Sequence, residues 1–164
     1  MTLEALALRY LRFERRCMLV ALERGICLGE PDAFGITPAR YAIEIEIKRS
    51  MADFRANERK HHVRSREWRL SEWPKEFFFL VPSVLMEKAK SILPPYAGLL
   101  HAGEVDFSTF TAVDSPINKE SKKVSIKNCC RMAAKQSLTV VSLRSKLDQL
   151  TYKSNTQYGL EYQI

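Results

Sequence analysis

The 164-residue sequence lacks an apolar run near the roughly 18 residues that a membrane-spanning helix needs. Its first residues, MTLEALALRYLRFERR, carry Glu4 and several arginines, so they do not form the apolar region of a signal peptide. Internal repeats and low-complexity segments are also missing. These absences argue against a membrane or secreted protein. We expect a protein of the cytoplasm, which is the bacterial host cytoplasm if the gene belongs to a phage.

Cysteine is scarce and forms no metal-binding pattern. The four cysteines include no C-x-x-C pair and no histidine-rich partner segment; they are Cys17, Cys27, Cys129 and Cys130. A structural zinc site needs about four such ligands at short spacings, so the sequence argues against one. We expect reduced thiols packed in the core.

Acidic residues are outnumbered, with 19 Asp and Glu against 26 Lys and Arg, which gives a net charge of +7. This excess favours a polyanionic partner, although it does not distinguish a nucleic acid from an acidic protein. The basic residues are dense from Arg49 to Lys75 and again from Lys119 to Lys135. An apolar content of 46% in a chain of this length is enough to build one buried core.

Hydrophobic periodicity and turn residues predict a helix over residues 2–24, with Thr2 as its cap and Gly25 after its end. Further predicted helices cover about 51–62 (capped by Ser50), 83–92 (capped by Ser83) and 127–150. Predicted strands cover 26–30, 32–37, 41–48, 76–82, 97–102 and, as an edge strand, 105–113, with a turn at 37–40. The tail 151–164 is polar and is expected to be partly disordered.

This order of elements predicts an α/β fold with a central mixed β-sheet flanked by helices. We expect residues 1–113 to form the core. Residues 114–164 would form a C-terminal extension whose helix packs on the same domain.

The strand at 41–48 alternates strictly, which places Ile43, Ile45 and Ile47 on one face and Glu44, Glu46 and Lys48 on the other. Alternation alone would also fit an outer face in solvent. A second observation comes from the preceding segment, because Pro31-Asp32 stands fourteen positions before Glu46 at the start of another predicted strand.

Pro31-Asp32 followed by a strand ending Glu46-Ile47-Lys48 resembles the PD-(D/E)XK motif of the restriction-endonuclease-like nuclease superfamily. The superfamily core is α-β-β-β-α-β, the order predicted above for residues 2–82, and here a C-terminal helix would be added. The run EIEIKRSMADFRAN, with EFFFLVP and YAGLLHAG after it, is similar to small phage and bacterial members, including those near the MmcB-like DNA-repair group. The resemblance covers about residues 20–105.

The resemblance implies a metal-dependent nuclease that hydrolyses phosphodiester bonds of DNA. Asp32 and Glu46 would bind Mg²⁺ or Mn²⁺, hard cations that prefer oxygen ligands, and the backbone carbonyl of Ile47 would add a third oxygen. Such an ion activates water and stabilises charge on the phosphate, and Lys48 would assist beside it. The superfamily often adds a glutamate from the first helix, for which the candidate is Glu23. Weaker alternatives are Glu14 in the same role, and Glu44 or Glu30 as a metal ligand.

The basic segment after this strand, with Trp68 and Trp73 among its charges, suits a track for DNA phosphates with base stacking. The predicted DNA contacts are Arg49, Ser50, Arg55, Arg59, Lys60, His61 and Arg64; some of these charges would face solvent simply for solubility. A homodimer is favoured if both strands are cut. The alternative hypotheses are a non-catalytic DNA-binding protein and a phage structural or interaction protein that retains the fold.

Overall fold

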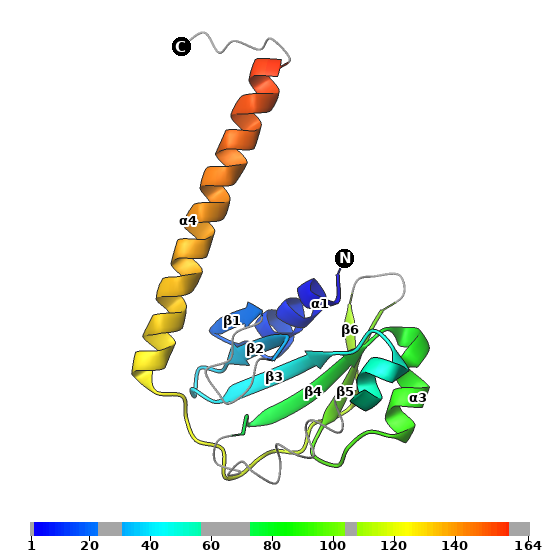
Figure 1. The fold of residues 1–164 in the computed structure, drawn as a ribbon. Coiled ribbons are helices and arrows are strands. Elements are labelled where there is room, and N and C mark those ends of the chain that lie inside the picture. The colour runs from blue at the N-terminus through cyan, green and yellow to red at the C-terminus, as the bar shows by residue number, and fades with distance from the viewer. Residues whose placement is uncertain (1, 23–30, 57–72, 104–107, 158–164) are drawn as a thin grey trace. The chain divides into compact units, whose positions relative to one another are not determined.

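The computed structural model of the protein describes residues 2–22, 31–56, 73–103 and 108–157 (Figure 1). The chain divides into two compact units, Met1–Ile126 and Lys127–Ile164. Residues 114–126, assigned by the sequence to the C-terminal extension, belong to the first unit. The second unit contains nearly all of α4 (Ile126–Gln157), and its expected packing on the core stays a prediction.

The first unit is built on a six-stranded mixed sheet whose strands follow one another in chain order. They are β1 (Leu19–Leu22), β2 (Ala33–Ile36), β3 (Ala42–Ile47), β4 (Glu76–Val81), β5 (Gly98–Ala102) and β6 (Thr109–Val113). The first three form an antiparallel meander, β4 and β5 continue parallel to β3, and β6 closes the edge antiparallel to β5. This is the predicted α/β class with a mixed sheet, and the predicted edge strand is confirmed as β6.

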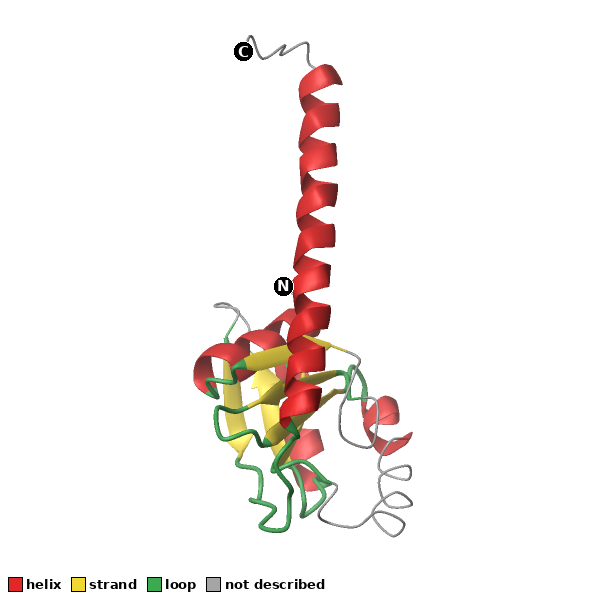
Figure 2. Ribbon diagram, turned by 90° about the vertical axis from the view of Figure 1, so that its left-hand side faces the viewer, coloured by secondary structure: helices red, strands yellow, loops and turns green. Residues whose placement is uncertain are grey.

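Helices cover both faces of this sheet (Figures 1 and 2). On one face, α1 (Leu3–Arg9) and the π-helical turn η1 (Tyr10–Glu14) pack on the isoleucines of β3 and on alternate residues of β4 and β5. On the other face, the helical residues 51–56, η3 (Ser83–Leu85) and α3 (Met86–Ser91) pack on the remaining side chains of β4 and β5. Both β3 and β4 are therefore buried on both faces. Within the described residues, no helix is long and apolar enough to cross a membrane.

The helix predicted over residues 2–24 is wrong in its second half. Thr2 caps it as predicted, since its Oγ1 accepts a hydrogen bond from the backbone of Ala5 at 3.3 Å. The helix nevertheless ends at Glu14, and β1 follows at Leu19. Beyond Glu14 the helix prediction depended on the spacing of the apolar residues, and this spacing also fits a strand.

The chain reverses at Arg16, whose φ of 52° lies in the left-handed region. The backbone N–H of Cys17 turns back to the carbonyl of Leu11 at 2.9 Å, and the guanidinium of Arg12 donates to the Cys17 carbonyl at 2.8 Å. Helices usually end this way at glycine, because a Cβ is strained at positive φ. Because residue 16 is arginine and not glycine, the sequence does not indicate that the helix ends here.

Other boundaries follow the sequence more closely. Ser50 caps the helical residues 51–56 by accepting a hydrogen bond from the Asp53 backbone at 3.1 Å, as predicted. Ser83 opens a 3-10 turn instead of capping the α-helix, which begins at Met86. The C-terminal helix runs to Gln157, so residues 151–157 are helical and not part of a disordered tail. The strand predicted at 26–30 and the helical residues predicted at 57–62 lie outside the described residues.

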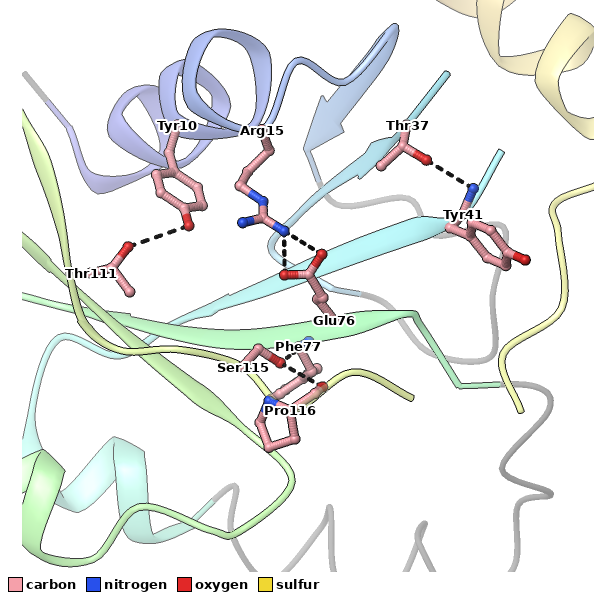
Figure 3. A network of polar contacts seen from close by, with 9 residues as sticks. All are labelled: Tyr10, Arg15, Thr37, Tyr41, Glu76, Phe77, Thr111, Ser115 and Pro116. Atoms are coloured by element: carbon pink, nitrogen blue, oxygen red, sulfur yellow. Dashed lines mark hydrogen bonds and ion pairs between the residues drawn. The ribbon is translucent and has the colours of Figure 1, made fainter. Parts of the chain in front are cut away.

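Polar contacts tie the N-terminal helix to the far strands (Figure 3). Arg15 forms an ion pair with the buried Glu76 at the start of β4, and the hydroxyl of Tyr10 lies 3.4 Å from that of Thr111 in β6. Phe77 lies one residue before β4 begins to pair with β5, and its N–H donates to Ser115 Oγ at 3.0 Å. Each contact satisfies a polar group that the packed layers would otherwise bury without a partner.

The thiol of Cys17 sits between the helical layer and β2. A Cβ placed on Gly35 would lie 2.6 Å from Cys17 Sγ, so this close approach requires glycine. Burial raises the pKa of the Cys17 thiol to about 11. Cys17 and Cys129 are free, buried thiols, as predicted, whereas the free thiol of Cys130 is exposed, so for that residue the prediction of a core position is wrong.

The raised pKa of Cys17 gives a pH dependence of stability. The unfolded thiol ionises near pH 9 and the folded one near 11, so the contribution is present below pH 9 and is lost as the pH rises through this window. We expect about 2 kcal/mol of the free energy of unfolding to be lost by pH 11 through this group. Urea titrations of the wild type and of Cys17→Ala at pH 8 and pH 11 measure it. An equal loss in both proteins would contradict the assignment.

Candidate metal centre

The register between β2 and β3 bears on the predicted carboxylate pair. Ala33 pairs with Ile45 in this antiparallel ladder. Asp32 comes directly before β2, and one further step of the same register would set it opposite Glu46, on the same face of the sheet. Their joint role as metal ligands stays a prediction.

Asp32 is fixed to the neighbouring strand by a hydrogen bond. Its Oδ2 accepts from the backbone N–H of Ile47 at 2.7 Å. The next N–H along, that of Lys48, points the other way and donates to Leu80 of β4 at 2.9 Å. Because the N–H and C=O of one strand residue point to the same side, the carbonyl of Ile47 is directed toward Asp32. The backbone oxygen named as a third ligand lies on the correct side of β3.

Lys48 shares the face of Glu46 and is buried with it. The ammonium Nζ lies 3.1 Å from Glu46 Oε2 and 5.9 Å from the ring centroid of Phe79. Lys48 is 2% exposed and Glu46 is 8% exposed. This pair is therefore held in a protein environment of low dielectric, where charge interactions are stronger than in water.

The outer face of the β3 strand is not a solvated one. Glu44 is 6% exposed and lies in register between Phe34 of β2 and Phe77 of β4. It is one pleat away from Glu46, on the side away from Lys48. Glu44 therefore lines the inner part of the same face, and its role as a ligand stays open.

Of the acidic residues considered as additions to the pair, only Glu14 and Glu44 lie within the described residues. Glu23, predicted at a helix end, and Glu30 lie outside the described residues. Glu14 ends η1 on the exposed surface. Within the described residues, no cluster of three or more His, Cys, Asp or Glu side chains is arranged to hold a metal ion.

The predicted DNA contacts start immediately after the pair. Ser50 caps the helical residues 51–56, and Arg55 is exposed on that helix. Arg49 points to the opposite face of the sheet, where it forms an ion pair with Glu4 of α1 while 64% of its side chain stays exposed. Its contact with DNA stays a prediction, as do those of Ser50 and Arg55. The other predicted contacts, Arg59, Lys60, His61 and Arg64, lie outside the described residues.

Phe77, Phe78 and Phe79 lie next to one another in the strand predicted at 76–82, and their order in the sequence does not show which one lies beside Glu46. The register sets Phe79 beside Glu46, and its ring is the apolar surface against which the Lys48 side chain lies. Only the pairing of β3 with β4 shows this, because the sequence by itself gives no register between distant strands.

The donor set fits a hard divalent cation. Mg²⁺ is usually bound by one or two carboxylates, with water and substrate phosphate oxygens completing its shell. Asp32, Glu46 and the Ile47 carbonyl supply three oxygens and no nitrogen or sulfur, a set that suits Mg²⁺ or Mn²⁺ better than zinc.

Comparisons with known proteins bear on the fold. No protein-family model matches the chain, and no curated protein matches it. A solved protein of unknown function from Silicibacter pomeroyi has a similar fold, with a TM-score of 0.61. The match covers 87% of this chain and 88% of that one at 23% sequence identity. At this identity the likeness shows the α/β fold alone.

The buried ion pair of Glu46 and Lys48 allows a prediction about stability. We expect Glu46→Gln to lower the free energy of unfolding by about 3 kcal/mol, because Lys48 then stays buried without its counter-charge.

The double variant Glu46→Gln with Lys48→Met removes both charges and should recover most of the loss. Urea unfolding of the two variants and the wild type at neutral pH measures these values. A double variant no more stable than Glu46→Gln would show that the pair is not coupled.

Proposed function

We propose that the protein is a metal-dependent nuclease that hydrolyses phosphodiester bonds of DNA. The proposal is supported above all by the joint position of Asp32, Glu46 and Lys48 at the carboxyl end of β3. The positive net charge of +7 supports a polyanionic substrate.

The composition of the two central strands, β3 and β4, favours a functional role of the buried charges over a purely structural one. Strands buried on both faces normally read as continuous apolar runs. β4 does so from Phe77 to Val81, after a first residue, Glu76, that is buried in an ion pair with Arg15. β3 is buried to the same degree but carries two glutamates, and a buried lysine follows it. Replacing a buried ion pair by apolar residues often leaves a fold as stable or more so, so stability alone does not account for the pair.

The roles of the residues follow from their positions. Asp32 and Glu46, with the Ile47 carbonyl, would hold Mg²⁺ or Mn²⁺. The ion would supply activation of the attacking water and stabilisation of charge on the phosphate. Lys48 carries a fixed positive charge beside these oxygens, suited to orienting water and stabilising the negative charge that develops on the phosphate oxygens.

The first functional prediction concerns cleavage. We expect Asp32→Asn and Lys48→Ala each to lower the rate of DNA cleavage by at least about 10²-fold, since each removes a positioned charge. Lys48→Arg should rescue poorly, because a planar fork does not fit the site of a compact ammonium. Plasmid and single-stranded DNA are incubated with Mg²⁺, Mn²⁺ or EDTA, and cleavage is followed on gels.

Metal titration on the same variants separates chemistry from folding. Lys48→Ala should keep its affinity for Mn²⁺ or bind slightly tighter, because a neighbouring cation has gone, whereas Asp32→Asn should bind weaker. Wild-type cleavage by both variants would remove the site from the mechanism. DNA binding without any cleavage by the wild type would favour the non-catalytic alternative, and neither binding nor cleavage would favour a structural or interaction protein.

A second functional prediction tests the DNA-binding face. We expect Arg55→Glu to weaken DNA binding on any sequence, and to reduce the slope of log affinity against log salt by about 1. The matched control is Arg9→Glu, an exposed arginine of α1 on the opposite face of the sheet. Fluorescence anisotropy at several salt concentrations measures both. Equal slopes in all three proteins would show that Arg55 only faces solvent.

A further inference from the structure

The long helix α4 (Ile126–Gln157) carries large apolar side chains in solvent. Six of them are between 55% and 70% exposed: Leu138, Val140, Val141, Leu143, Leu147 and Leu150. The same stretch is rich in serine, threonine and valine, which are mediocre helix formers. Helices in proteins draw most of their stability from packing an apolar face, so these side chains are suited to packing against another surface.

The spacing of the apolar residues indicates the kind of partner. From Ile126 to Leu150, positions that recur alternately three and four residues apart hold Ile, Cys, Ala, Gln, Val, Leu, Leu and Leu. Seven of the eight are apolar, and in the part from Ala133 to Leu150, about two and a half heptads, five of six are apolar, which is the spacing of a coiled-coil seam. Cys129 is buried, so the surface offered runs from Ala133 to Leu150. A repeat of 3.5 residues keeps this stripe facing another helix of similar length.

We propose that α4 pairs with α4 of a second copy of this chain, parallel and in register, as a two-stranded coiled coil. Val140 at an a position, with Leu143 and Leu150 at d positions, is the combination that favours two strands, whereas the other a positions of this surface, Ala133 and Leu147, are not β-branched. A second copy is also the partner that suits Gln136. In a parallel, in-register pair its amide meets the same amide across the seam, where one donates and the other accepts.

The residues beside the seam fit the same arrangement. Arg144 is at an e position and faces Thr139 at a g position of the other helix, so the pairing opposes no two cations there. Ala133 and Gln136 weaken the seam relative to leucine, and we expect a dissociation constant in the micromolar range. The pairing rests on α4 alone and does not depend on the nuclease proposal.

Sedimentation velocity of the full chain over about 1 to 100 µM tests the proposal. The mass should rise with concentration from the 18.9 kDa of one chain toward twice that value. Leu143→Glu combined with Leu147→Glu should weaken association by at least about a hundredfold, because each substitution enters a two-fold interface twice. The matched control is Leu138→Glu, at an equally exposed apolar position on the opposite side of the helix, and it should associate like the wild type.

A wild type that stays monomeric at the highest concentration overturns the proposal, as does equal loss of association in the Leu138 control. A second measurement needs no variant. The melting of helical circular dichroism should move to higher temperature as wild-type concentration rises, because dimerisation stabilises by mass action. A melting temperature independent of concentration contradicts the pairing. None of these readouts involves DNA, so their failure leaves the nuclease proposal untouched.

Discussion

The register between β2 and β3 is the constraint on which the candidate site depends. Ala33 pairs with Ile45, and one further step along the ladder brings Asp32 to Glu46. A slip of one residue would exchange the two faces of β3, turning its glutamates toward α1 and its isoleucines toward the other layer. The packing of Ile43, Ile45 and Ile47 on α1 therefore holds the acidic face in place, although none of these side chains has a chemical role.

The buried pair of Glu46 and Lys48 makes the end of β3 energetically costly. Two opposite charges that have left water cost more to bury than apolar side chains of the same size, and their mutual attraction offsets only part of that cost. In β4, its neighbour, the residues that pair with Glu44, Ile45, Glu46 and Ile47 are all apolar, and the one buried charge, Glu76, lies at the start of the strand in an ion pair with Arg15. The energetic cost of β3 is concentrated at one end, beside Asp32. The apolar layers on both faces restrict the positions that the two charged side chains can take, and so keep them close together.

Much of this arrangement was visible in the sequence, and the parts that were missed have identifiable causes. The alternation at 41–48, the apolar run of β4 and the cap at Ser50 are local signals, so they located strands and a helix start correctly. The end of the first helix was missed because Arg16, not glycine, takes the left-handed conformation. The burial of Glu44 and Glu46 could not be read from alternation, since an exposed strand has the same pattern. It depends on a helical layer supplied by residues far along the chain, including Phe54 and Ala89.

The antiparallel meander also has a consequence for the order in which the protein assembles. The segments that carry the two carboxylates are joined by a tight turn at Thr37–Tyr41, whose backbone hydrogen bond spans 2.9 Å. Hairpins of this kind close in about 1–10 µs. The parallel partner β4 begins 28 residues after Lys48, so its pairing waits for a much longer loop to close. We therefore expect the two carboxylates to meet first in water during folding, and the layers that bury them to pack later. The repulsion between the two carboxylates is then weakened by solvent at the stage when they first come together.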